Sequence, residues 1–175
     1  LMFREYDLRG RVGREEINEE TEILLGKAFA TTLLRKKITD TLVVGHDFRE
    51  YSPRLKDAFV QGVLATGMNV IDIGMCLTPM LYFAQYHFQT VAGAMITASH
   101  NDNGWSGVKF GNGYTQTLLG DGLTEIYELI QKDDFESGRG TLRTDSITEA
   151  YRESVVGKIK LTRPLRVVIE CGNGT

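Results

Sequence analysis

Apolar residues follow two different spacings along the chain, and their alternation predicts strands joined by helices. Short apolar runs occur at 41–45, 70–74 and 91–97, and each is interpreted as a buried strand. Between them, apolar residues recur at helical spacing in 52–66 and 78–88. Strands joined by helices form parallel pairs, with helices packed on both faces of the sheet. We therefore expect a three-layer α/β/α sandwich with a mixed, largely parallel sheet.

Residues typical of helix starts support this interpretation. Ser52 and Thr78 each precede a proline, so both are expected to cap a helix whose first position is proline. A longer amphipathic pattern predicts a helix from about Asn18 to Lys36. Further helices are expected over 123–131 and 145–158.

The last third of the chain has a different pattern. A strand is predicted at Gly107–Phe110, and the Asn-Gly pair at 112–113 is a strong hairpin signal. Near the end, Arg166–Cys171 is interpreted as a new strand followed by a turn. We expect residues 1–160 to form one domain. Residues 161–175 would be a linker and the first strand of a truncated next domain, so the chain is expected to be a fragment of a longer protein.

Composition narrows the functional classes. Hydrophobic residues make up 42% and charged residues 25% of the 175 residues, and the net charge of −3 is spread without a basic cluster. This distribution indicates no nucleic-acid partner. No apolar run approaches the roughly 20 residues of a membrane helix, and the N-terminus lacks a secretion signal. Cys76 and Cys171 have no metal-type spacing, so we expect reduced thiols in a cytoplasmic protein.

The segment Thr97–Asn101 is the strongest candidate for chemistry. It directly follows a predicted buried strand, and open α/β sheets bind ligands beyond the carboxyl ends of their strands. Ser99 there is either a nucleophile or simply part of a turn. A serine hydrolase is the less favoured alternative. The neighbouring His100 diverges from Ser99, and the G-x-S-x-G elbow is absent, although His46 or His87 could reach the serine.

Each basic residue elsewhere in the chain is, taken alone, weak evidence for a phosphate-binding or catalytic role. Lys109 suits a phosphate or a moving proton, but it also suits a solvated strand. Arg4 and Arg9 lie close to the N-terminus, and arginine is the usual bidentate partner of phosphate. Gly120–Gly122 is interpreted as a turn, because it contains one carboxylate and Mg²⁺ prefers several oxygen ligands.

Taken together, these segments resemble the α-D-phosphohexomutases. Phe3–Gly10 resembles the opening motif of that family, Thr97–Asn101 resembles its catalytic serine loop, and Gly107–Lys109 resembles the segment after that loop. Three further segments are similar and occur in the expected order: Gly45–Arg49, Thr78–Pro79 and, as the start of the second domain, Arg166–Thr175.

The resemblance implies a reaction. In this family a phosphoserine donates its phosphoryl group to a hexose phosphate, the bisphosphate reorients, and the other phosphate returns to the serine. The implied reaction interconverts hexose 1-phosphate and 6-phosphate, of mannose and/or glucose, through a hexose 1,6-bisphosphate. A phosphoserine carries about −1.5 to −2 charges, so it needs nearby cations. The implied partners are these sugar phosphates and the later domains of the same protein.

The resemblance also implies roles for single residues. Ser99 would carry the phosphoryl group and, through its phosphate, bind one Mg²⁺ whose remaining ligands are expected in the missing second domain. The implied catalytic residues are Ser99, Lys109, Arg9 and His100. The implied substrate-binding residues are Tyr6, Arg9, Asn101 and Lys109.

Three positions depart from the family pattern. Asp102 stands where proline is usual, Trp105-Ser106 replaces an aromatic-asparagine pair, and His46 replaces an arginine. The alternatives are a phosphoglucosamine mutase of the same superfamily, whose opening motif usually differs, and a sugar-phosphate-binding module without catalysis. Without the later domains, this chain is expected to be inactive alone.

Overall fold

The structure is a computed structural model, and it describes residue 2 and residues 7–172. The strands within this part of the chain are β1 (Leu8–Arg11), β2 (Thr41–His46), β3 (Asn69–Met75), β4 (Ala92–Ile96), β5 (Trp105–Gly113), β6 (Gln116–Thr117) and β7 (Leu142–Thr144). The helices are α1 (Glu19–Arg35), α2 (Ser52–Leu64), α3 (Thr78–His87), α4 (Gly120–Lys132) and α5 (Thr148–Val156).

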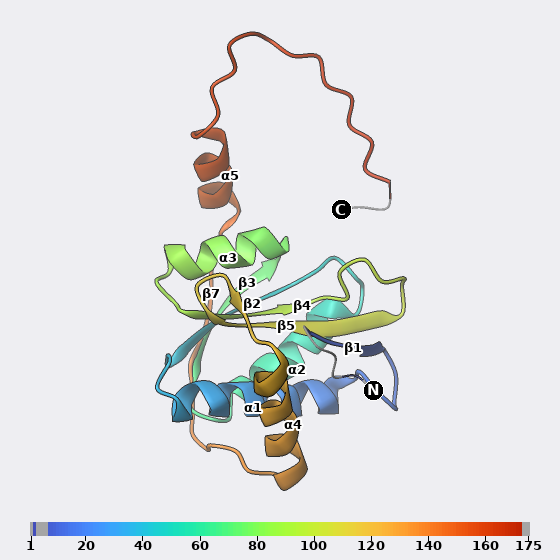
Figure 1. Cartoon of the computed structure of the whole chain (residues 1–175), viewed down its shortest axis with the longest axis vertical. Coiled ribbons are helices and arrows are strands. Elements are labelled where there is room, and N and C mark those ends of the chain that lie inside the picture. Colours follow the sequence, from blue (N-terminus) through green and yellow to red (C-terminus); the bar gives the residue numbers. More distant parts are fainter. Residues whose placement is uncertain (1, 3–6, 173–175) are drawn as a thin grey trace.

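The strands form one mixed sheet in the order β1-β5-β4-β2-β3-β7, with β6 paired to β5. The pairs β4–β2, β2–β3 and β3–β7 are parallel, whereas β5 is antiparallel to β1, β4 and β6. Strand β5 therefore runs against the other six. Helices α1, α2 and α4 cover one face of the sheet, and α3 and α5 lie on the other (Figure 1). This architecture confirms the expected α/β/α sandwich with a mixed, largely parallel sheet.

The face covered by α1 and α2 is tightly packed. Helix α1 begins with a capping box, in which the Asn18 side chain accepts a hydrogen bond of 3.0 Å from the Thr21 amide. Phe29 of α1 and Phe59 of α2 are fully buried, and both rings pack against Phe110 of β5, with centroids 4.7 and 6.3 Å away. These aromatic contacts join both helices to the sheet.

Two glycines let α1 and α2 approach each other at backbone level. A Cβ on Gly26 would lie 2.2 Å from the Phe59 carbonyl oxygen, and one on Gly62 would lie 2.1 Å from that of Ile23. A side chain at either position would force the helices apart.

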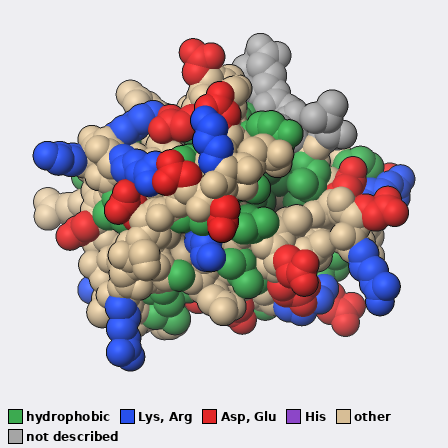
Figure 2. Space-filling view, turned by 90° about the horizontal axis from the view of Figure 1, so that it is seen from below, with side chains coloured by type: hydrophobic (Ala, Val, Ile, Leu, Met, Phe, Trp, Pro, Cys, Tyr) green, Lys and Arg blue, Asp and Glu red, His purple; other side chains and the backbone are tan. Residues whose placement is uncertain are grey.

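The outer surface on this side has basic and acidic side chains interspersed (Figure 2). Part of this pattern comes from ion pairs between α1 and the region of α4. Arg35 contacts Asp134 and Glu136, both at 2.8 Å, and Lys36 pairs with Glu125 of α4. Such exposed pairs contribute only about 0–1 kcal/mol each.

The opposite face has a smaller core built on α3. Val43, Ile71 and Met95 project from the sheet into this second cluster, where Leu81 of α3 meets them. Ile147, directly before α5, is buried in the same cluster. Helix α5 is therefore attached to the domain mainly through its N-terminal end.

The predicted helix caps were wrong. The N-cap residues of α2 and α3 are Tyr51 and Leu77, and neither makes a side-chain capping bond. Ser52 and Thr78 are instead the first helical residues. The Ser52 hydroxyl donates to the Asp47 carboxylate at 2.6 Å, so it is used in a tertiary contact.

The predicted Asn-Gly turn was also displaced. Gly113 still belongs to β5 and pairs with Gln116, which places the reversal at Tyr114 and Thr115. Thr115 adopts a left-handed φ of 55°. A Cβ on Gly113 would lie 2.6 Å from Oε1 of Gln116, so a larger residue there would require that flexible side chain to move.

The end of the chain differs from its prediction. Helix α5 covers 148–156, a shorter span than the expected 145–158, and Val155 and Val156 are exposed. Residues 166–171 form no strand and extend away from the sheet (Figure 1). A strand needs a neighbour for its backbone groups, and this segment has none within the described residues. The proposed boundary at 160 stays a prediction. Among the helices of the described residues, none combines the length and the apolarity needed to cross a bilayer.

Candidate functional site

Ser99 lies at the carboxyl edge of the sheet, in the loop after β4. Ala98 is fully buried, whereas Ser99 itself is exposed. The Ser99 backbone has a left-handed φ of 56°, and the Asn101 amide donates to the Ala98 carbonyl at 3.1 Å. This tight turn presents the serine hydroxyl outward. His100 Nδ1 lies 3.4 Å from Ser99 Oγ, at the long end of the hydrogen-bond range, so the expected divergence of these two side chains was wrong.

Arg9 joins the N-terminal motif to the serine loop. Because β1 pairs with β5, Arg9 lies beside the residues that follow the loop. Its Nη1 donates to Asn101 Oδ1 at 2.6 Å, and its Nε donates to Asp7 Oδ2 at 2.7 Å. The structure thus brings two predicted site residues together across 92 positions of sequence. Tyr6, the other candidate in this motif, lies outside the described residues.

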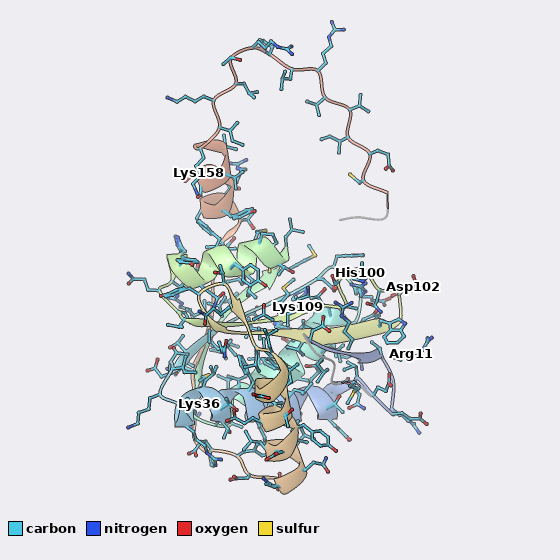
Figure 3. The ribbon with its side chains drawn as sticks, viewed as in Figure 1. Arg11, Lys36, His100, Asp102, Lys109 and Lys158 are labelled. Atoms are coloured by element: carbon cyan, nitrogen blue, oxygen red, sulfur yellow. The ribbon has the colours of Figure 1, made fainter. Side chains whose placement is uncertain are left out.

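Lys109 lies on the α3 side of the sheet. It is paired in register with Met95 of β4, whose side chain belongs to the α3-side core. Val108 and Phe110, on either side of it, belong to the opposite core. Figure 3 places Lys109 nearer the middle of the sheet than His100. Lys109 forms no ion pair with any other residue that the structure describes, so its charge is uncommitted there.

A cleft of about 790 Å³ opens beside Ser99. One part of its lining is apolar, from Phe48, Met75, Cys76, Leu77, Met80 and Met95. The rest is polar, from Asp47, Arg49, Thr78, Thr97, Ser99, His100 and Thr148. Burial and the charge of Asp72 raise the pKa of the Cys76 thiol to about 12. A thiol that stays protonated is a poor nucleophile, which argues against a reactive cysteine in this cleft.

Two functional candidates were not singled out by the sequence interpretation, which noted Gly45–Arg49 only as a segment similar to the family. Asp47 and Arg49 follow β2, and both side chains are buried directly against the serine loop. A signal was present in the sequence. An acidic and a basic residue follow a strand parallel to β4, and parallel strands end at the same edge of the sheet.

The other histidines do not form a catalytic triad with Ser99. The His46 ring bonds the Asp47 carbonyl at 2.7 Å, which requires a proton on its Nδ1. The His87 ring stacks on Phe83 with centroids 5.9 Å apart. Within residues 7–172, no carboxylate bonds His100 in the way a triad requires. These positions agree with the low weight given to the hydrolase alternative.

The fold and site define a class of protein: an α/β/α domain that displays an exposed serine hydroxyl at the carboxyl edge of its parallel strands, with basic side chains around it. Comparison with known proteins narrows the class. The family described as "Phosphoglucomutase/phosphomannomutase, alpha/beta/alpha domain I" matches residues 1–137. The chain belongs to this family.

Similar proteins agree with this assignment. A phosphoglucomutase of Neisseria meningitidis is 37% identical over 99% of this chain and 37% of its own length. A phosphomannomutase of Escherichia coli is 37% identical over 98% of this chain and 38% of its own length. A crystal structure of a family protein from Burkholderia thailandensis superposes with a TM-score of 0.86 at 32% identity, over 94% of this chain and 37% of that one. The chain thus spans less than two fifths of the length of these relatives.

Proposed function

We propose that this chain is the phosphoserine-bearing domain of a phosphohexomutase that interconverts hexose 1-phosphate and 6-phosphate of mannose and/or glucose. The observation that carries the proposal is the exposed Ser99, held in a left-handed turn at the carboxyl edge of β4. Two similar proteins are named phosphoglucomutase and phosphomannomutase, which supports both sugars as substrates. No observation favours the glucosamine-specific or the non-catalytic alternative.

In the proposed reaction, the phosphoryl group moves between Ser99 Oγ and a sugar hydroxyl. When the sugar bisphosphate donates, a bond forms between Ser99 Oγ and phosphorus, and the bond from phosphorus to the sugar oxygen breaks. The hydroxyl proton leaves Oγ, and the sugar oxygen gains a proton as it becomes a hydroxyl. His100 Nδ1, 3.4 Å away, is positioned to accept that proton after a small tightening of the loop. Positioning and charge stabilisation supply most of the acceleration in such transfers.

Two cations are candidates for stabilising the transferred charge. Lys109 is the stronger candidate, because it lies on the cleft side of the sheet and is not paired within the described residues. Arg9 is already bonded to Asp7 and Asn101, so we assign it mainly to fixing the Asn101 side chain. Asn101 and Tyr6 are proposed to bind the substrate.

Mg²⁺ is the proposed cofactor, with Ser99 contributing one ligand through its phosphate. Within residues 7–172 there is no cluster of three or more His, Cys, Asp or Glu suited to a metal. The Asp47 carboxylate bonds Thr97 of the loop, and both its oxygens are occupied by hydrogen bonds. Among the described residues, Ser99 is therefore the single proposed ligand of the ion. The other ligands are proposed to come from later domains. When bound, the ion would neutralise phosphoryl charge.

The remaining partners follow from the same proposal. Hexose phosphates and hexose 1,6-bisphosphate are the proposed ligands, and the domains after residue 160 are the proposed protein partners. Residues 161–175 are proposed to lead into the second domain. Cys76 and Cys171 are free thiols, which suits a cytoplasmic location. Because the metal carboxylates are absent from its described part, the isolated chain is expected to show no turnover.

Phosphopeptide mapping tests the proposal. The full-length protein is incubated with glucose 1,6-bisphosphate, and phosphate is located by mass spectrometry. We expect phosphate on Ser99, and Ser99→Ala should abolish both labelling and turnover. Ser146→Ala is the control, because Ser146 is exposed and lies after β7, outside the cleft lining. Labelling of another residue with Ser99 always unmodified would contradict the assignment.

A further inference from the structure

A buried ion pair lies beneath the serine loop. Asp47 and Arg49 are each 8% exposed, and their side chains are in direct contact. The Asp47 carboxylate also accepts hydrogen bonds from the Arg49 amide at 3.1 Å, from the Ser52 hydroxyl at 2.6 Å and from the Thr97 hydroxyl at 2.8 Å. This single carboxylate therefore joins the end of β2, the start of α2 and the end of β4.

The network holds the backbone of Ser99 from both sides. On one side, the Ser99 amide donates to Thr97 Oγ1 at 2.9 Å. On the other side, Arg49 Nη2 donates to the Asn101 carbonyl oxygen at 2.6 Å and lies 3.4 Å from that of Ser99. Thr97 and Arg49, which make these contacts with the loop, are both bonded to the Asp47 carboxylate.

These contacts explain the backbone of the nucleophile. A φ of 56° is disfavoured for any residue with a Cβ, and it persists only where surrounding contacts impose it. The conformation directs the Ser99 hydroxyl out of the turn while the preceding Ala98 stays fully buried. A loop relaxed to an ordinary backbone conformation would turn the hydroxyl away from this direction.

We propose that Asp47 and Arg49 are positioning residues, which hold Ser99 in its left-handed conformation and so aim its oxygen for phosphoryl transfer. The proposal rests on the proposed function. Misplacing a reacting atom by about 1 Å can cost about a hundredfold in rate, so such a scaffold affects the reaction without touching the sugar. Arginine is required because its fork reaches the carboxylate and the loop carbonyls together, whereas lysine has a single nitrogen.

The rival assignment makes Arg49 a direct phosphate ligand, because its side chain lines the cleft. The geometry disfavours it. Nη1 is directed at Asp47 and Nη2 at the Asn101 carbonyl, and the guanidinium charge is neutralised by the buried carboxylate. A phosphate ligand would instead present free N–H groups to the cleft.

The test uses the full-length protein with Arg49→Lys and Asp47→Asn. Arg54→Lys is the matched control, because Arg54 lies on α2, five residues after Arg49, its side chain is 56% exposed, and it pairs only with Glu19 among the described residues. Thr97→Val and Thr97→Ser form a second pair, in which the serine variant retains the bonding hydroxyl. The readouts are kcat and KM for glucose 1-phosphate, thermal unfolding, and hydrogen exchange of the amides in 97–104.

We expect Arg49→Lys, Asp47→Asn and Thr97→Val to lower kcat by about 10- to 100-fold, with KM changed less than about threefold. Amide exchange in 97–104 should rise at least about tenfold, while Thr97→Ser and Arg54→Lys stay near wild type. If an Arg49 or Asp47 variant fails to fold, the Thr97 pair carries the test, because its substitutions are smaller.

Three outcomes would overturn the proposal: unchanged exchange in 97–104, faster exchange with an unchanged kcat, or a raised KM with an unchanged kcat. The last outcome would make Arg49 a phosphate ligand. If wild-type protein never carries phosphate on Ser99, the proposed function fails separately. The exchange measurement then still decides whether the network holds the loop, because it needs no substrate.

Discussion

The two faces of the sheet are built differently. On the α1/α2 face, helices meet at backbone level through Gly26 and Gly62, and Phe59 is fully buried between them and the sheet. On the α3 face, the core is smaller and opens into the cleft beside Ser99, where Met75 is 66% and Leu77 50% exposed. One face stabilises the fold, and the other leaves apolar and polar surface accessible beside the nucleophile.

This difference indicates how the site is supported. The serine loop is bonded through Thr97 to Asp47, which also bonds Ser52 at the start of α2, while Ser99 itself is exposed beside the cleft. A reactive group needs solvent access, whereas its scaffold needs dense packing. Substitutions on the two faces should therefore separate stability from activity.

The largest expected effect on the free energy of unfolding concerns Glu22, which lies on α1, on the α1/α2 face of the sheet. Both carboxylate oxygens are buried without a hydrogen-bond partner among the described residues, and burial raises the pKa of Glu22 from 4.5 to about 8. The folded state therefore binds this proton more tightly than the unfolded chain does. The contribution of Glu22 to stability is fully present below pH 4.5 and is lost as the pH rises through 8.

We expect the wild-type free energy of unfolding to fall between those pH values by up to about 5 kcal/mol relative to Glu22→Gln. Urea unfolding from pH 4 to 9 measures this difference, with Glu20→Gln, on an exposed neighbouring residue, as the control. Parallel pH curves for the wild type and Glu22→Gln would show that the carboxylate does not titrate in this way.

The second expected effect compares the two cores directly. Phe59→Ala should cost about 3–5 kcal/mol of unfolding free energy, because the tightly packed side chains of the α1/α2 face cannot fill the cavity that the substitution creates. Met80→Ala should cost less than about 2 kcal/mol, because Met80 lines the open cleft. Both values come from urea denaturation of the same chain. Equal costs would mean that the α3 face is as rigid as its counterpart.

A third substitution breaks the contact between α1 and α2. Gly62→Ala places a Cβ 2.1 Å from the Ile23 carbonyl oxygen. The forced separation should cost about 1–3 kcal/mol, more than the gain of up to about 1 kcal/mol from replacing a helical glycine. Thermal denaturation measures the change, and Gln61→Ala, one position earlier and exposed, should leave Tm nearly unaltered. A stabilised Gly62→Ala protein would refute the close approach.

The smallest expected effect on stability accompanies a large effect on rate. Lys109→Ala should change the free energy of unfolding by less than about 0.5 kcal/mol, because the structure describes no ion pair for Lys109. In the full-length enzyme, kcat should nevertheless fall by about 10- to more than 100-fold, as a charge-assisted hydrogen bond is lost. Lys158→Ala, on an exposed residue just beyond α5, is the control. A near-normal kcat would contradict the catalytic role of Lys109 and indicate a solvated lysine on a strand.

Local patterns in the sequence were enough to predict most of the central fold. The run of β-branched residues at 41–45 and the helical spacing around Phe29 are short-range signals, and both elements formed where expected. The segment around Ser99 was also identifiable, because a polar loop after a buried strand is a local feature. The edge strands β1 and β7 were not predicted, since four and three residues carry too little periodicity.

Tertiary structure alone decided what holds the site together. Ser52 gave a convincing capping signal, but its hydroxyl bonds Asp47 across the strand-to-helix loop. Arg9 and Asn101 are 92 residues apart and meet because β5 brings β1 beside the serine loop. Such contacts depend on strand order, and local spacing does not encode strand order. The residues around Ser99 could therefore be named from the sequence, but the bonds that join Asp47 and Arg49 to its loop could not.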